Sequence, residues 1–212
     1  MKRMPPNNVF AHAAKDHVIF KDERVLSPEF IPAVLPHRDN QVNSIVYALR
    51  PLAEGGKATH VFVYGPPGTG KTVTLRFVMD QLKEYASRVK PVYLNCFGFN
   101  TRQSVLAELT RIVERPVPSR GMSTNELYAK VLEGLKFVKF IPVLVFDEFD
   151  QLMLKKEEGV VYDLTRAGEN YGINFATVLI SNNSNLLETL DQRIRSSLSP
   201  KKIEFPRYTP IE

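Results

Sequence analysis

The chain has 212 residues, of which 43% are hydrophobic and 24% charged, enough for one large globular domain with a substantial core. No apolar run approaches ~18 residues and the polar N-terminus lacks the apolar stretch of a secretion signal, so we expect a cytoplasmic protein without a membrane partner. The single cysteine, Cys96, excludes an internal disulfide and is expected to be a small buried hydrophobe. A net charge of +5 is compatible with a nucleic-acid partner or with an ordinary solvated surface.

The chain opens with a segment, residues 1–27, that we interpret as an N-terminal arm. Apolar residues then recur with helical spacing and predict a helix over Asp39–Leu49. Asp39 is a candidate cap for this helix, and Pro51 is expected to end it.

The next stretch, VFVYGPPGTGKT, is the most informative in the chain. The apolar run His60–Tyr64 predicts a short buried strand, and Val73–Tyr85 continues with helical spacing. The pattern G-x-x-x-x-G-K-[ST] between a strand and a helix is typical of a phosphate-binding loop, or P-loop. Its members are Gly65, Pro66, Pro67, Gly68, Thr69, Gly70, Lys71 and Thr72.

The chemistry of phosphate binding explains these residue types. Gly65 and Gly70 allow the backbone to turn tightly and aim its N–H groups at phosphate oxygens. The following helix offers the positive end of its dipole. Lys71 can reach the β- and γ-phosphates, and the Thr72 hydroxyl can bind Mg²⁺.

Strands and helices alternate through the rest of the chain. Further strands are predicted at Val89–Cys96, Ile141–Phe146, Asn174–Ser181 and Lys201–Phe205. Further helices are predicted at Thr101–Val113, from a Ser123–Glu126 capping box to about Val138, and at Tyr162–Ala167. The alternation predicts an α/β fold, a mainly parallel five-stranded sheet flanked by helices, with ligands beyond the carboxyl ends of its strands.

Two acids follow the third predicted strand, in the run VLVFDEFD. Asp147 would hold Mg²⁺, directly or through its water shell, and Glu148 would polarise the attacking water. Solvated acids at a strand end are the alternative, but a P-loop earlier in the same sheet favours the catalytic interpretation.

Polar residues also follow the fourth strand, where Asn182 could hydrogen-bond the γ-phosphate or fix the attacking water. An ordinary turn explains the same residues, since serine and asparagine favour turns.

The segment RPVPSRGM, residues 115–122, predicts a short, stiff and basic loop. Arg115 and Arg120 in such a loop could enter the minor groove of DNA, where a narrow negative channel attracts arginine. The alternative is an exposed connector between two helices.

Taken in order and spacing, GPPGTGKT, VFDEFD, ISNN and LDQRIRSSL resemble the core of an AAA+ ATPase. More narrowly, LSPEFIPAVLPHRDNQ, RPVPSRGMSTNELYAKVLEGL and ISNNSNLLETLDQRIRSSLSPKKIEFPRYTPIE resemble archaeal replication initiators of the origin-recognition and cell-division-cycle type. The resemblance runs from about Val25 to the last residue and covers the P-loop NTPase core.

The resemblance implies several roles. Pro36, His37 and Arg38 would lie near the adenine, with Lys71 and Glu148 catalytic. Asn182 would be the polar first sensor. Arg193 or Arg195 would face the nucleotide of a neighbouring subunit or serve a related interface role, although Ser197 stands where relatives often carry an arginine finger. Residues 28–207 would be the nucleotide-binding core, and 208–212 the start of a lid that the chain does not continue.

The leading hypothesis is therefore an ATP-binding, slowly hydrolysing ATPase core of a DNA replication initiator, with Mg²⁺ as its metal and ATP as an assembly switch. Its expected partners are double-stranded origin DNA, further initiator subunits and a replicative helicase, in a nucleoid-associated location. Two alternatives stay open: another P-loop ATPase, such as a transposition helper or a signalling ATPase, and a DNA-binding module with a structural nucleotide.

Overall fold

A computed structural model describes residues 25, 27, 30–114 and 121–209. The chain divides into two compact units, Met1–Pro32 and Ala33–Glu212. All helices and strands named below belong to the second unit.

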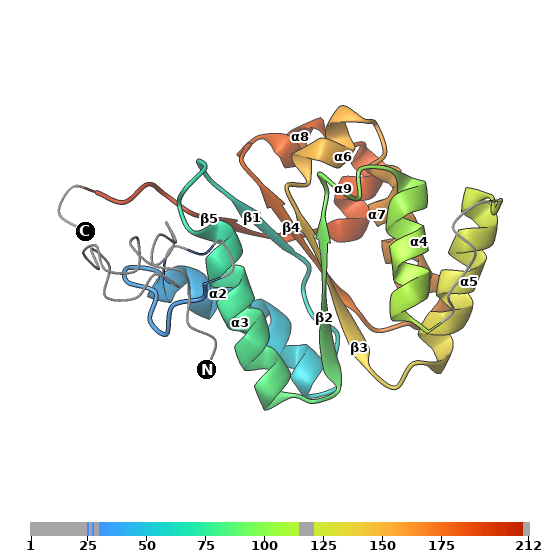
Figure 1. Ribbon diagram of the computed structural model, residues 1–212, viewed down its shortest axis with the longest axis horizontal. Coiled ribbons are helices and arrows are strands. Elements are labelled where there is room, and N and C mark those ends of the chain that lie inside the picture. Colours follow the sequence, from blue (N-terminus) through green and yellow to red (C-terminus); the bar gives the residue numbers. More distant parts are fainter. Residues whose placement is uncertain (1–24, 26, 28–29, 115–120, 210–212) are drawn as a thin grey trace, which may run out of the picture. The chain divides into compact units, whose positions relative to one another are not determined.

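Five parallel strands form one sheet in the order β2-β3-β4-β1-β5 (Figure 1), which confirms the predicted fold class. The strands are β1 (Val61–Tyr64), β2 (Val89–Asn95), β3 (Ile141–Asp147), β4 (Ala176–Ser181) and β5 (Lys201–Glu204). Because β4 lies between β1 and β3, whatever follows β4 comes between the P-loop and the acids that follow β3.

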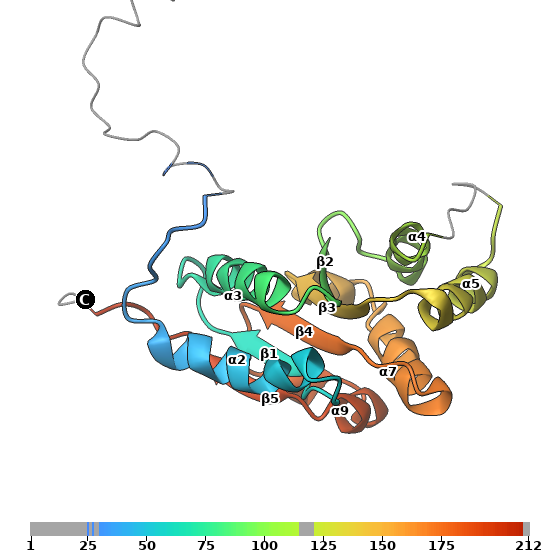
Figure 2. The ribbon, with the colours of Figure 1, turned by 90° about the horizontal axis from the view of Figure 1, so that it is seen from below.

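The described residues also form eight helices, of which α2 precedes the first strand and the others lie between strands. They are α2 (Asp39–Ala53), α3 (Lys71–Tyr85), α4 (Arg102–Ile112), α5 (Thr124–Phe137), α6 (Asp150–Leu154), α7 (Gly159–Tyr171), α8 (Leu186–Thr189) and α9 (Gln192–Leu198). The predicted Ser123–Glu126 capping box is present at the start of α5, and Thr101 with Ser104 forms another at α4. Figures 1 and 2 both show α4 beside α5, in agreement with their packing contacts.

The sheet separates two hydrophobic clusters, because alternate residues of a strand point to opposite faces. Val61 and Val63 of β1 pack with α2 and α3, whereas Phe62 between them packs with the helices of the other face, α4 to α9. The same alternation divides Val145 from Phe146 in β3. Both faces are therefore covered, as a parallel sheet requires.

Two local predictions at α2 were wrong. Arg38, not Asp39, occupies the N-cap, and the helix continues through Pro51 to Ala53. Pro51 lies in the last turn, where a missing N–H costs one hydrogen bond and the helix is already ending.

Pro91 is tolerated in β2 because that strand is at the edge of the sheet. None of the described helices is long and apolar enough to cross a membrane.

Candidate functional site

The P-loop needs glycine at two positions. Gly65 has φ +150°, and a Cβ on it would lie 2.2 Å from the carbonyl oxygen of Phe205, so the exit of β5 passes where any other side chain would stand. Gly70 has φ +86° at the N-cap of α3, where no side chain caps the helix. The loop therefore turns straight into a helix N-terminus whose N–H groups no side chain covers, an arrangement that suits phosphate.

Lys71 is the polar centre of the site. Its Nζ donates hydrogen bonds to the carbonyl oxygens of Gly65 (2.8 Å) and Pro66 (2.9 Å) and to Oδ1 of Asn182 (2.7 Å). The side chain is buried, and burial lowers the pKa of Lys71, an effect that the Glu148 carboxylate partly opposes. The ammonium group is thus aimed across the loop by three acceptors.

Thr72 and Asp147, the two residues predicted as metal ligands, lie side by side. Thr72 Oγ1 donates a hydrogen bond to Asp147 Oδ1 at 3.2 Å. Burial raises the pKa of Asp147 above its ordinary value, while the hydrogen bond from Thr72 lowers it in part. A hydroxyl and a carboxylate side by side are hard oxygen donors of the kind that Mg²⁺ prefers.

Glu148 leaves β3 in a left-handed conformation, with φ +55°. Such a backbone conformation costs on the order of 1–3 kcal/mol in a residue other than glycine and is typical of functional sites. Glu148 Oε2 accepts a hydrogen bond from Asn182 Nδ2 at 3.0 Å. Burial raises the pKa of Glu148, and the nearby carboxylates of Asp147 and Asp150 raise it further.

Asn182 therefore connects Lys71 to Glu148 through the two ends of one amide. The sheet order explains this position, since Asn182 follows β4 and β4 lies between β1 and β3. Ser181 and Asn183 do hydrogen-bond each other, as a turn would require, but a turn alone does not account for the contacts of the Asn182 amide with Lys71 and Glu148.

Asp150 positions the segment after β4 and was not among the residues predicted from the sequence. Its Oδ1 accepts a hydrogen bond from Ser181 Oγ (2.9 Å), and its Oδ2 accepts one from the backbone N–H of Asn182 (3.2 Å). The first residue of α6 thus holds the end of β4. The only sequence signal was the third acid in VFDEFD, which resembles an ordinary helix start.

Arg38 is buried against the P-loop. One guanidinium nitrogen donates to the carbonyl oxygens of Thr69 (2.9 Å) and Pro206 (3.0 Å), and the group lies 3.9 Å from the ring centroid of Tyr208. Tyr208 in turn donates a hydrogen bond to the carbonyl oxygen of Pro36 at 3.5 Å. Arg38 therefore ties the segment before α2, the P-loop and the exit of β5 together. His37 precedes it with φ +57°.

The two candidate interface arginines on α9 differ in their surroundings. Arg193 is paired with Asp191, the N-cap of its own helix, at 3.2 Å. The exposed side chain of Arg195 has no hydrogen-bond or ion-pair partner among the described residues. Ser197 donates a hydrogen bond to Thr165 Oγ1 at 2.8 Å, which fastens α9 to α7.

The predicted DNA-binding arginines, Arg115 and Arg120, lie outside the described residues. Two other arginines of the same region are paired: Arg102 with Asp163 (2.8 Å) and Arg111 with Glu108 (2.8 Å). Cys96 is fully buried as expected, and burial raises the pKa of its thiol to about 12.

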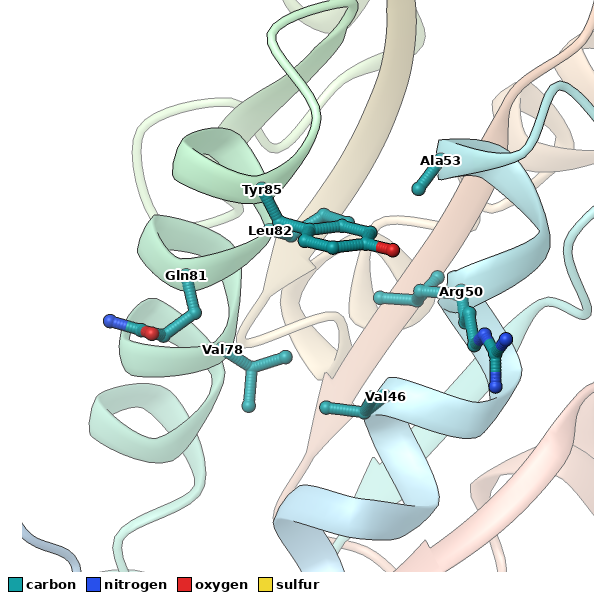
Figure 3. Close-up of a pocket in the computed structure, with 8 residues that line it drawn as sticks. Val46, Arg50, Ala53, Val78, Gln81, Leu82 and Tyr85 are labelled. Atoms are coloured by element: carbon teal, nitrogen blue, oxygen red, sulfur yellow. The ribbon is translucent and has the colours of Figure 1, made fainter.

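A separate groove of about 310 Å³ lies between α2 and α3. Figure 3 shows Val46, Arg50 and Ala53 of α2 facing Val78, Leu82 and Tyr85 of α3, with the Tyr85 ring directed toward α2. It contains none of the predicted site residues, so it is distinct from the nucleotide site.

The residues at the P-loop fit a magnesium–nucleotide complex. An uncapped helix N-terminus and a buried lysine suit phosphate, and Thr72 with Asp147 suits the metal. Within the described part of the chain, no group of three or more His, Cys, Asp or Glu side chains could hold a metal ion. A cation here would therefore share its coordination between these two side chains, phosphate oxygens and water.

Comparisons with known proteins agree with this geometry. The sequence model of a family described as "AAA domain" matches residues 54–190. The chain is 38% identical to the ORC1-type DNA replication protein 1 of Sulfurisphaera tokodaii over 196 residues, which are 92% of this chain and 49% of that protein. It is 39% identical to the ORC1-type DNA replication protein 1 of Archaeoglobus fulgidus over 206 residues, 95% of this chain and 50% of that protein.

Among solved structures, the Aeropyrum pernix ORC1 protein in complex with DNA matches with a TM-score of 0.80 and 32% identity, over 89% of this chain and 50% of that one. The chain thus spans about half the length of the relatives it matches. These matches confirm the resemblance to archaeal replication initiators.

Proposed function

The chain belongs to the AAA domain family, and from that premise we propose that it is the ATPase core of a DNA replication initiator, which hydrolyses ATP slowly and uses it as an assembly switch. One observation carries the proposal: Asn182 hydrogen-bonds Lys71 on one side and Glu148 on the other, at the edge of the sheet where the P-loop begins. A phosphate-binding cation, a polar sensor and a candidate base are thereby held as one unit.

In this proposal the P-loop residues Gly65–Thr72 cradle the phosphates, and Thr72 and Asp147 hold Mg²⁺. The metal, when bound, neutralises charge on the β- and γ-phosphates. Lys71 exchanges its Asn182 contact for a phosphate oxygen. Glu148 orients a water and accepts its proton. Its raised pKa lies closer to neutral pH than that of an ordinary glutamate, which makes it a stronger base.

Adenine recognition is assigned to the segment before α2. Pro36 and His37 contact the base, while Arg38 positions them by holding the carbonyl oxygens of Thr69 and Pro206. Of the three residues predicted to lie near the adenine, Pro36 and His37 would thus contact the base, and Arg38 would position them. The guanidinium of Arg38 is already surrounded by protein groups and has little surface left for a ligand.

Assembly with other subunits is assigned to α9. Arg195 is the better candidate for a contact with a neighbouring nucleotide, because Arg193 is paired with Asp191. Ser197 is excluded as a substitute for a finger, since its hydroxyl is directed at Thr165. Further initiator subunits and a replicative helicase are the partners we propose for this switch.

DNA is the proposed second ligand, because a relative of 32% identity has been solved in complex with DNA. Arg115 and Arg120 are proposed to contact double-stranded origin DNA in a nucleoid-associated protein. We further propose that residues 28–207 form the nucleotide-binding core, with 1–27 as an arm and 208–212 as the start of a lid.

Steady-state ATP turnover with equilibrium ATP binding tests the central proposal. Binding with slow, Glu148-dependent turnover supports an initiator ATPase. Binding without any turnover would instead support a DNA-binding module with a structural nucleotide. Turnover that DNA does not influence, in a chain that does not bind DNA, would favour a different P-loop ATPase.

A further inference from the structure

A second hollow, of about 300 Å³, is lined by residues at the amino-terminal ends of β2 and β3. These strand ends lie on the side of the sheet opposite the P-loop, as the course of the strands shows (Figure 1). Three connections meet there. Arg88 precedes β2, Lys136 and Lys139 flank the end of α5, and Tyr171 ends α7. The backbone N–H of Ile141 donates to the carbonyl oxygen of Arg88 at 2.6 Å, which fixes Arg88 beside the start of β3. We call Arg88, Lys136, Lys139 and Tyr171 the basic hollow.

The basic hollow has an unbalanced charge. Its described lining contains three cations and no carboxylate. Arg88 and Lys139 are exposed, and neither makes an ion pair or a side-chain hydrogen bond within the described residues. Lys136 has a structural explanation, because it lies in the last turn of α5 and complements the helix dipole. Arg88 and Lys139 belong to no helix, so the dipole does not explain them.

Exposed aromatic rings accompany these cations. Tyr171 is 51% exposed, and Lys136 Nζ lies 4.6 Å from its ring centroid. Lys90 Nζ lies 4.6 Å from the ring of Phe140, which also lines the basic hollow. Phe137 is 69% exposed in an adjoining hollow of about 430 Å³, where Glu114 is the one acid among the described lining residues.

We propose that the basic hollow binds single-stranded nucleic acid, with Arg88 and Lys139 on phosphates and Tyr171 stacked on a base. Unpaired cations attract any polyanion, whether nucleic acid or acidic protein. Exposed rings beside the cations distinguish the two, because an unpaired base offers a face for stacking and a carboxylate does not. A duplex would offer its phosphates but hide its base faces.

This inference extends the proposed DNA binding to a second surface and does not depend on the nucleotide site. The nucleotide site lies at the carboxyl ends of the strands and the basic hollow at their amino ends. The seven residues of β3 separate these two ends by roughly 20 Å, at about 3.3 Å per residue. It also differs from the contact proposed for Arg115 and Arg120, which concerns duplex DNA. The basic hollow can therefore be altered without touching the nucleotide site.

The test is fluorescence anisotropy of a labelled oligothymidylate with the full chain at several salt concentrations. Arg88→Gln with Lys139→Gln should flatten the slope of log K against log salt by about 1.4, since each phosphate contact contributes about 0.7 for single strands. Tyr171→Ala should weaken binding roughly five- to a hundredfold and leave the slope unchanged. Lys83→Gln is the matched control, an exposed cation in the last turn of α3 outside the basic hollow.

Unchanged slope and affinity in these variants, with the parent chain still binding, would overturn the inference alone. No binding of any DNA by the parent chain would overturn both this inference and the proposed DNA binding. Loss of binding to polyglutamate, with oligothymidylate binding intact, would assign the surface to an acidic protein instead. An unchanged thermal midpoint of each variant verifies that folding is not the cause.

Discussion

The Oδ1 atom of Asn182 accepts a hydrogen bond of 2.7 Å from Nζ of Lys71, so the P-loop lysine points toward the side-chain amide of Asn182. The same amide donates to Glu148 at 3.0 Å. A change at Asn182 should therefore reach both the phosphate-binding cation and the proposed base. This coupling is the reason why substitutions of Asn182 and Glu148 are expected to change ATP turnover.

Lys71→Ala should weaken ATP binding, whereas Glu148→Gln should leave binding intact and stop turnover. Loss of a charged hydrogen bond to phosphate costs about 1.5–3 kcal/mol, or roughly ten- to a hundredfold in affinity. Loss of a general base lowers turnover by about 10²–10⁴-fold. Calorimetric titration and a phosphate-release assay measure the two effects, with Lys83→Ala on the same helix as the control. Turnover at the parent rate in Glu148→Gln would show that another group is the base.

Asn182→Asp should shift the pH dependence of turnover. The new carboxylate can still accept from Lys71, but it replaces the donor to Glu148 with a second negative charge and raises the pKa of Glu148 further. Because the base must be ionised, the acidic limb of the turnover profile should move to higher pH. Asn182→Ala should lower turnover and move the acidic limb less than Asn182→Asp does, because it removes the donor to Glu148 without adding a charge, and Asn183→Ala should do neither. Identical profiles for Asn182→Asp and the parent would refute the contact as a functional one.

Glu148→Gln should also stabilise the nucleotide-free protein near neutral pH. Folding raises the pKa of Glu148, so the parent is most stable, as far as this group is concerned, below the ordinary pKa of glutamate. That contribution is lost as pH rises through the raised folded value. The thermal midpoint of Glu148→Gln minus that of the parent should therefore grow with pH over this window and then stay constant. A difference that does not vary with pH would disprove the linkage.

Arg38→Lys should destabilise the fold although it keeps the charge. Lysine has no planar guanidinium that could stack on Tyr208 while its end donates to the carbonyl oxygens of Thr69 and Pro206. We expect the free energy of unfolding to fall by about 1–3 kcal/mol, with weaker ATP binding because Thr69 loses a support. Urea denaturation measures the first effect. Arg50→Lys, at an exposed pair with Glu54, should stay within about 0.5 kcal/mol of the parent. Equal losses in both variants would contradict a special role for Arg38.

Replacing Arg115 and Arg120 together by glutamine should weaken binding to all duplex sequences similarly. Each arginine that neutralises a phosphate contributes about 0.9 to the slope of log K against log salt on duplex DNA, so the double variant should flatten it by about two units. Anisotropy titrations at several salt concentrations measure this slope. Arg111→Gln, at an exposed ion pair with Glu108, is the control. An unchanged slope would move the contact elsewhere, with Lys201, Lys202 and Arg207 the next candidates.

The sequence was sufficient to predict the five strands and the P-loop, and the residues predicted as metal ligands, Thr72 and Asp147, lie within hydrogen-bond distance of each other. Continuous apolar runs specify buried parallel strands, and a phosphate-binding loop requires glycine and lysine at fixed spacing. The short helices α6 and α8 were not predicted, because one turn is too short to show a helical period.

The supports of the site could not be predicted, because they depend on tertiary contacts. Arg38 donates a hydrogen bond to the carbonyl oxygen of Pro206, which is 168 positions later in the chain. The sequence around either residue does not predict this contact. Asp150 holds Asn182 across the gap between two strands. The left-handed backbone of Glu148 likewise follows from how the chain leaves β3, since an isolated glutamate avoids it.

The sheet order has a consequence for how the protein is made. β1 is paired on both sides, but its partners come late: Val61 pairs with Val178 of β4 and with Lys201 of β5. A ribosome adding about 5–20 residues per second needs roughly 6–20 s to travel from β1 to β4. During that time the apolar strand leading into the P-loop has no neighbour within the nascent sheet. Protease sensitivity of ribosome-bound chains arrested before and after β4 would reveal the step at which β1 becomes protected. The strand that leads into the P-loop can therefore join the sheet only after most of the chain has been synthesised.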